Sequence, residues 1–166
     1  PWLLIGIFSG IVASWILDGF QSQLATVTVL ALFIPIIGGT GGNVGVQASA
    51  IVVQGLANGS LEIKDFARQI GKEFLIGLLN ATVISLVMFV YNLFFIPDNF
   101  AVTLSVAVSL FLVTMFATIL GSVVPLTLEK LKINPALATG PFIQISNDIF
   151  GLIIYVWIST LFLKLW

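Results

Sequence analysis

The residue with the clearest chemical potential is Asp148, which lies midway along residues 133–163, a stretch with no other charge. A carboxylate at the centre of a bilayer costs about 2.5–3.5 kcal/mol on insertion scales, so such groups usually face a cavity or an ion pathway. No Lys or Arg lies in this stretch to neutralise it. A mobile cation is therefore its natural partner. The alternative is a carboxylate that only ties helices together through Gln144, Ser146 or Asn147.

Other polar groups share the predicted helical face of this carboxylate. Gly140, Gln144 and Asp148 are spaced four residues apart, which places them on one side of a helix, and Gly151 and Tyr155 continue that side. The face offers a carboxylate, an amide and backbone carbonyls. Oxygen ligands of this kind suit hard cations such as Mg²⁺ or Ca²⁺.

A glycine-rich run at residues 38–45, Gly-Gly-Thr-Gly-Gly-Asn-Val-Gly, is the second candidate. Together with Pro35, it predicts a bend or break in the surrounding helix. Irregular backbone at membrane depth is tolerated only where it is buried in protein or lines water. Glycine carbonyls that face Asp148 would then form a cation path. The alternative is close helix packing, because the run repeats small residues every four positions.

Composition places these groups in a membrane protein. Of the 166 residues, 59% are hydrophobic and 8% are charged, whereas soluble domains carry about 25% charged residues. The chain has no cysteine or histidine, which excludes a thiolate nucleophile, an imidazole base and the usual zinc ligands. An enzyme is not expected, because no second midplane carboxylate is available for acid–base chemistry. The net charge of −1 offers no basic surface for nucleic acid.

The spacing of the charges predicts an all-α integral membrane fold. Residues 19–61, 74–97 and 99–128 carry no charge, and each of these segments exceeds the roughly 20 residues that cross a bilayer. Residues 62–73 contain six charges and are expected to form a solvated loop. No internal repeat or linker divides the sequence, so residues 1–166 are interpreted as one transmembrane ion-conducting domain. Five transmembrane helices are predicted, over about 2–20, 24–57, 70–95, 101–128 and 135–165.

The basic residues predict the orientation of these spans. Those between the second and third helices and between the fourth and fifth fall on one side, and only Lys164 lies opposite. Because basic loops stay in the cytoplasm, the N-terminus is expected in the cytoplasm and the C-terminus outside a cell (plasma or inner) membrane. The residues on the shared side are Lys64, Arg68, Lys72, Lys130 and Lys132.

Two motifs then resemble a known family. Residues 41–47, Gly-Gly-Asn-Val-Gly-Val-Gln, and Asn134-Pro135-Ala136 followed by Asp148 are similar to the membrane domain of MgtE magnesium channels, over essentially the whole chain. The resemblance implies a homodimer whose pore is lined by the second and fifth helices of both subunits. It also implies Mg²⁺ as the transported and bound ion, held at Asp148 largely through its water shell. The family's cytosolic N-terminal and CBS domains are absent from these residues, so the chain is either a piece of a longer protein or gated differently.

The candidate metal site combines the helical face with the resemblance. Backbone carbonyls of Gly39, Gly42 and Gln144 are implied to complete the site of Asp148, and Gly140 joins it from the shared face. A dimer also follows from charge, because one midplane carboxylate per chain needs a symmetry partner to offer a hydrated dication two charges. The expected partners are a second copy, membrane lipid and divalent cations. The alternative function is a carrier or exchanger of divalent cations coupled to sodium or protons.

Overall fold

The computed structural model describes residues 2–21, 28–62, 66–97, 99–138 and 140–165. Within these residues all regular structure is helical, which confirms the predicted all-α class. The helices are α1 (Trp2–Gly19), the 3-10 helix η1 (Thr28–Phe33), α3 (Ile34–Ala57), α4 (Phe66–Phe95), α5 (Phe100–Lys130), the 3-10 helix η3 (Pro135–Ala138) and α6 (Pro141–Leu165).

Among the described residues, four helical segments are long and apolar enough to cross a membrane. They cover residues 28–57, 66–95, 100–130 and 141–164. The first helix, α1, is also apolar but shorter, with 18 residues. At 1.5 Å per residue it is about 27 Å long, close to the roughly 30 Å thickness of a hydrocarbon core. The chain is therefore an integral membrane domain of several helices.

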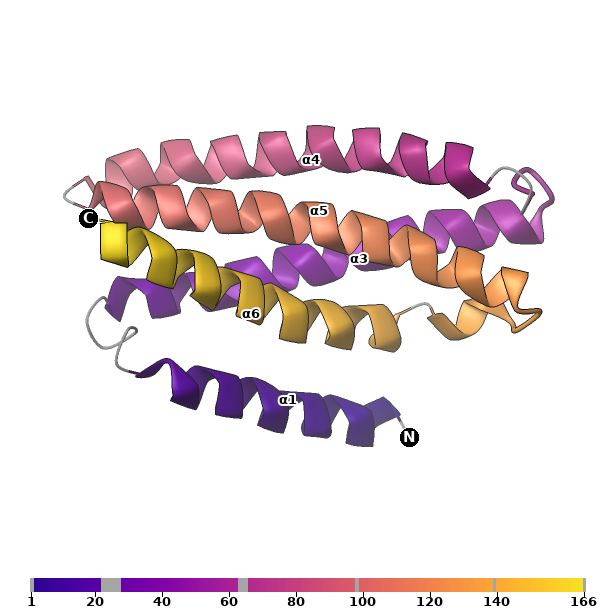
Figure 1. Ribbon diagram of the computed structural model, residues 1–166, viewed down its shortest axis with the longest axis horizontal. Helices are drawn as coiled ribbons and strands as arrows, with labels where there is room; N and C mark the ends of the chain where they lie inside the picture. The colour runs from indigo at the N-terminus through magenta and orange to yellow at the C-terminus, as the bar shows by residue number, and fades with distance from the viewer. Residues whose placement is uncertain (1, 22–27, 63–65, 98, 139, 166) are drawn as a thin grey trace.

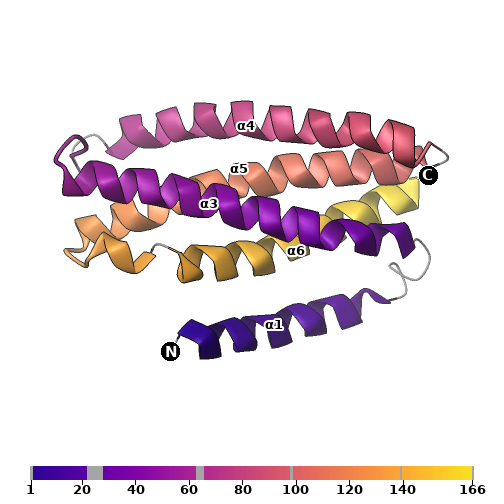
Figure 2. The same cartoon turned by 180° about the vertical axis from the view of Figure 1, so that it is seen from behind.

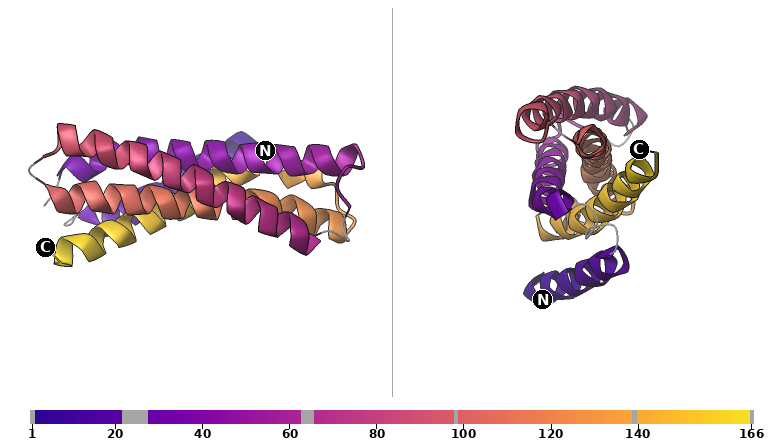
Figure 3. Two further views of the ribbon diagram at one scale, coloured as in Figure 1. Left: turned by 90° about the horizontal axis from the view of Figure 1, so that it is seen from above. Right: turned by 90° about the vertical axis from the view of Figure 1, so that its left-hand side faces the viewer.

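The helices α3, α4, α5 and α6 form a bundle, and α1 lies beside α6, apart from the other three (Figures 1 and 3). From behind, α3 lies in front of α5 and α6 and crosses them obliquely (Figure 2), and it packs against both. The most central helix is α5. In its most apolar stretch of 18 residues 61% are buried, against 11% in the corresponding stretch of α4. Small residues make this central place possible, because Gly, Ala, Ser and Thr let neighbouring backbones approach.

Two contacts illustrate this close packing around α5. The Ser85 hydroxyl on α4 donates a hydrogen bond of 2.6 Å to the Ala107 carbonyl on α5. On the other side, Gly121 of α5 lies against the backbone carbonyl of Gly45 on α3, where a side chain would collide with backbone. Since lipid provides little hydrophobic drive between helices, such dispersion contacts and hydrogen bonds hold the bundle together.

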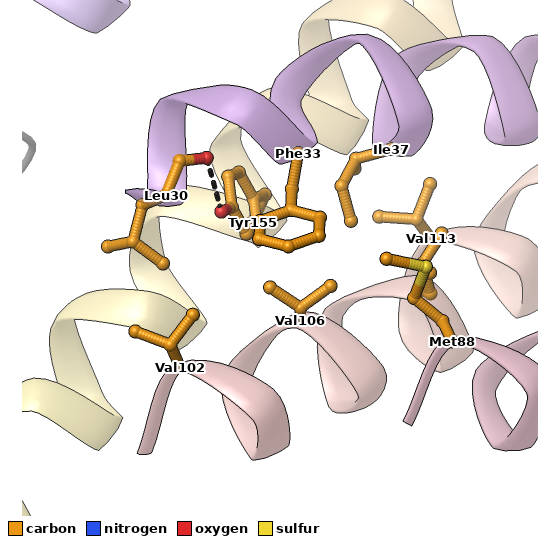
Figure 4. Close-up of a cluster of buried hydrophobic side chains, with 9 residues drawn as sticks. Leu30, Phe33, Ile37, Met88, Val102, Val106, Val113 and Tyr155 are labelled. Atoms are coloured by element: carbon orange, nitrogen blue, oxygen red, sulfur yellow. Dashed lines mark hydrogen bonds between the residues drawn. The ribbon is translucent and has the colours of Figure 1, made fainter. Parts of the chain in front are cut away.

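A cluster of buried apolar side chains joins η1, α3, α4, α5 and α6 near one end of the bundle (Figure 4). Tyr155 is its largest fully buried member, and its hydroxyl donates a 2.7 Å hydrogen bond to the Leu30 carbonyl of η1. This bond fixes η1 to α6 and satisfies the one polar group that Tyr155 brings into the cluster. The cluster comprises Leu30, Phe33, Ile37, Met88, Val102, Val106, Leu110, Val113 and Tyr155.

The predicted break of the helix at the glycine run is wrong. Residues 38–45 lie inside the continuous α-helix α3. In a membrane every backbone group must find a partner within the protein, so helical hydrogen bonding outweighs the weak propensity of glycine. The change of geometry comes earlier, where η1 gives way to α3 at Ile34. Pro35 then occupies the first turn, where its missing N–H costs nothing.

Other predicted boundaries also change. The fifth predicted helix divides into η3 and α6, with Gly140 between them at φ 64°. This left-handed conformation favours glycine, and Pro141 then opens α6. Residues 66–73 form the first turns of α4 rather than a loop, and Glu73 is buried there with a hydrogen bond of 2.9 Å from Gln69. The predicted helical residues 24–27 and the basic residue Lys64 lie outside the described residues.

Candidate functional site

Two cavities meet at Asp148, between α1 and the α3–α6 pair. The larger is about 800 Å³ in volume and the smaller about 250 Å³. Asp148 and Ala13 line both. The larger cavity is lined by Leu3, Gly6, Ile7, Ser9, Gly10, Ala13, Val46, Gly140, Pro141, Gln144, Ile145 and Asp148. The smaller is lined by Ala13, Leu17, Ile34, Pro35, Ile37, Gly38, Gly39, Asp148, Leu152 and Tyr155.

The two polar side chains of α6 form a bonded pair at this junction. The Gln144 carboxamide donates a hydrogen bond of 3.1 Å to Oδ1 of Asp148, one helical turn further along. Both side chains are half-buried. The i, i+4 spacing that the sequence indicated therefore brings the two groups together. The bond leaves the second carboxylate oxygen outside this contact.

Glycines of α3 provide the surface against which this pair rests. A Cβ built on Gly42 would overlap the Gln144 carboxamide, and one built on Gly38 would lie 3.6 Å from Oδ1 of Asp148. The polar side chains of α6 thus lie close to α3 because glycine has no side chain there. Gly38 was absent from the predicted site, although it belongs to the same glycine run.

Gly39 and Gly140 border the cavities in different ways. Gly39 lines the smaller cavity, and a Cβ built on it would meet nothing within 4 Å. Gly140 lines the larger cavity, but it precedes α6 instead of belonging to its polar face. Its carbonyl accepts a hydrogen bond of 3.0 Å from the Gln144 backbone N–H, so it already serves the first turn of α6.

The continuation of the predicted polar face is only partly correct. Tyr155 lines the smaller cavity, with its hydroxyl bonded to the Leu30 carbonyl. Gly151 instead turns toward α5, where a Cβ would lie 3.3 Å from Val113. Beyond Asp148, the side of α6 that borders the cavities therefore includes Tyr155 but not Gly151, which packs against α5.

The side of α6 about 100° around the helix from Gln144 and Asp148 is packed into the bundle. Ile143 and Asn147 are fully buried, and both would collide with a Cβ built on Gly45 of α3. Neither amide atom of Asn147 has a hydrogen-bond partner among the described residues. Asn147 thus occupies the space that Gly45 leaves free and does not line the cavities, although it directly precedes Asp148 in the chain.

The first helix contributes a wall that the sequence reasoning missed. Gly6, Ser9, Gly10 and Ala13 of α1 line the larger cavity across from Gln144 and Asp148. Their spacing of three, one and three residues is typical of one helical face. This spacing was the available signal, but small residues on a membrane helix indicate packing as readily as a cavity.

The donor set of the cavities is sparse and made of oxygen and amide groups. Among the described residues, no group of three or more His, Cys, Asp or Glu side chains could hold a metal ion. Asp148 is the one acidic residue among the described side chains that line the two cavities. Such a set suits a cation that keeps most of its water shell, as Mg²⁺ commonly does.

Comparison with known proteins adds an independent finding. Residues 34–158 match the model of the MgtE family, described as a divalent cation transporter. The chain is 36% identical over 163 residues to the magnesium transporter MgtE of Bacillus subtilis, and 37% identical over 164 residues to that of Thermus thermophilus. Each alignment covers 98% of the chain but 36% of the relative, so the chain spans about a third of the length of these relatives.

Proposed function

Because the chain belongs to the MgtE family of divalent cation transporters, we propose that it forms the ion-conducting part of a magnesium channel, with a hydrated Mg²⁺ held at Asp148. The observation that carries this proposal is the position of Asp148, hydrogen-bonded to Gln144, at the meeting point of two cavities. Among the described residues that line the two cavities there is no Lys or Arg, so the carboxylate needs another positive partner, and a passing cation supplies it.

The chemistry of the site favours a hydrated ion over a dehydrated one. Mg²⁺ gives up its water reluctantly and is commonly bound through one or two carboxylates while it keeps several waters. Asp148 would attract the ion, and the hydrogen bond from Gln144 would hold the carboxylate in one orientation. Backbone carbonyls of Gly39, Gly42 and Gln144, together with Gly140, belong to the proposed site through waters of the hydrated ion.

The proposed assembly is a homodimer with a pore lined by α3 and α6 of both subunits. A single chain offers one carboxylate, whereas two chains about a symmetry axis would offer a dication two. The exposure of Gly39 supports this arrangement, because a Cβ built on it would meet nothing within 4 Å, which leaves this part of α3 accessible to a second copy.

The proposed orientation has a cytoplasmic N-terminus. The turn after α3 and the turn between α5 and η3 lie at the same end of the bundle as the start of α1 (Figure 1). The basic residues Arg68, Lys72, Lys130 and Lys132 gather at that end. Since basic residues remain in the cytoplasm, this clustering supports the orientation predicted from the sequence.

The test is Mg²⁺ flux into liposomes that contain the full-length protein. Asp148→Asn should reduce flux at least about 100-fold, because it removes the charge but keeps the shape of the side chain. Asp18→Asn is the matched control, since Asp18 is exposed at the end of α1 and lines neither cavity that contains Asp148. Normal flux through folded Asp148→Asn protein would refute the proposal. Flux that saturates and stops without a sodium or proton gradient would identify a coupled carrier instead.

A further inference from the structure

The side of α1 that faces the protein is unusual for a membrane helix. Among the α1 side chains that the structure describes, Ser9 is the one buried residue, with 5% of its surface exposed. Phe8 and Trp15 line neither cavity and point away from the protein, with 64% and 68% of their surfaces exposed, whereas Leu3 and Ile7 border the larger cavity. Four of the six α1 residues that line the larger cavity are small, and one of them carries a hydroxyl.

Ser9 borders the same cavity as the proposed ion site. It lines the 800 Å³ cavity together with Gln144 and Asp148 of α6. The cavity therefore has α6 on one side and α1 on the other, and Val46 of α3 completes the lining. In the proposed function, an ion that reaches Asp148 through this cavity passes α1.

Helix packing is the competing explanation for small residues on α1. Where small residues serve packing in this chain, backbones touch, as at Gly121 and the Gly45 carbonyl. On α1 the opposite holds, because a Cβ built on Gly6 or on Gly10 would meet nothing within 4 Å. The small face of α1 thus keeps a space open. A hydrated ion needs such a space to pass.

We propose that α1 forms a third wall of the ion path and that Ser9 lines this path, with its hydroxyl in contact with the water shell of the passing cation. This inference rests on the proposed function and extends it from α3 and α6 to α1. A hydroxyl is suited to this role because it donates and accepts hydrogen bonds without adding a charge that would trap the ion.

The test uses cysteine accessibility, because the 166 residues contain no cysteine. Ser9→Cys and Phe8→Cys are made in the full-length protein, with any cysteine outside these residues replaced, and are reconstituted in liposomes. A positively charged, membrane-impermeant methanethiosulfonate is added, and thiol modification is measured by mass spectrometry. Phe8 is the matched control, since it is adjacent on α1 but exposed on the outer side.

We expect the reagent to modify Ser9→Cys at least about tenfold faster than Phe8→Cys, and the cationic adduct to reduce Mg²⁺ flux at least about tenfold by repulsion in a low-dielectric cavity. Millimolar Mg²⁺ should slow the modification. Equal rates at the two positions would overturn the inference, as would modification of Ser9→Cys that leaves flux unchanged.

The failure of this inference is distinguishable from failure of the proposed function. The rate of thiol modification does not depend on transport, so it reports on the cavity even in a protein that conducts nothing. If Ser9→Cys is not modified and Asp148→Asn does not conduct Mg²⁺, α1 is rejected as a wall of the ion path and Asp148 is retained as the ion site. Normal flux in Asp148→Asn protein would reject the ion site itself. Serine and cysteine are nearly isosteric, so the folding of the variant is not at risk.

Discussion

The two faces of α6 carry neighbouring polar residues with opposite surroundings. Asn147 is fully buried in a notch at Gly45, whereas Asp148 is half-buried at the junction of two cavities. Gln144 lies on the same side as Asp148 and bonds to it. A rotation of about 100° per residue separates the two environments. One face holds α6 in the bundle, and the other presents its polar groups to open space.

The glycines of α3 divide in the same way. Gly41 and Gly45 leave room for buried neighbours, as a Cβ on Gly41 would lie 2.7 Å from Val113 and one on Gly45 would collide with Asn147. Gly42 accommodates the flexible end of Gln144, and Gly39 borders a cavity. One glycine-rich run therefore serves packing on one face and the candidate site on the other. This difference predicts different outcomes for the same substitution along one helix.

The largest difference is expected between Gly45→Val and Gly39→Val. At Gly45, the new side chain has to displace Asn147 and Ile143 and to approach the Ala117 carbonyl. Overpacking of this kind costs about 1–3 kcal/mol and occasionally more, so thermal unfolding in detergent should occur at a clearly lower temperature. At Gly39 the added atoms enter open space, and the unfolding temperature should stay close to that of the unmodified protein. Equal destabilisation at both positions would contradict the division of the run.

An intermediate effect is expected for Gly42→Ala, measured against Ala50→Gly. The methyl group at Gly42 meets the carboxamide of Gln144, which can swing aside but then loses its place beside Asp148. Flux should fall about tenfold, because a small misplacement of a site group has a large effect, while stability changes little. Ala50 is exposed on the same helix, and its loss of one methyl should leave flux unchanged. Lower stability of Gly42→Ala with unchanged conductance would remove Gly42 from the candidate site.

The smallest effect on stability is expected when either amide side chain of α6, Asn147 or Gln144, is replaced by leucine. Asn147→Leu replaces a buried amide that has no partner among the described residues, so stability should be unchanged or about 1 kcal/mol higher, with normal flux. Gln144→Leu removes the hydrogen bond to Asp148 and should lower flux by a few-fold without unfolding the protein. Thermal unfolding and liposome flux measured on both proteins distinguish the two faces. Strong destabilisation by Asn147→Leu would indicate that a bound water satisfies the amide.

Much of the fold was predictable because membrane helices follow local rules. Long uncharged segments predicted the bundle helices, and the helical class and the family resemblance are confirmed. The pairing of Gln144 with Asp148 followed from spacing alone, since a helix brings i and i+4 side chains together whatever its neighbours are. The roles of Asp148, Gln144, Gly39, Gly42 and Gly140 in ion binding remain predictions.

The errors came where local rules compete with the membrane environment. The run at residues 38–45 predicted a break, but the need to satisfy backbone groups in lipid keeps α3 continuous. Gly140 was assigned to a helical face, whereas its positive φ separates η3 from α6. A glycine in the sequence shows only that a position has no side chain. The missing side chain makes room for a turn at one position, for a packed neighbour at another and for a cavity at a third.

The sequence by itself determined that the chain is a helical membrane domain, that Asp148 is the one charged residue among residues 133–163 and that Gln144 lies one turn away. These properties depend on composition and helical periodicity, which act along a single segment. Only the tertiary structure decided which α3 glycine meets Asn147 and which meets Gln144, and that α1 borders the cavity through Ser9. Those contacts join residues far apart in the chain, and their geometry depends on how each helix is rotated against its neighbours. Rotation is set by the packing of all the helices together, so no single segment encodes it.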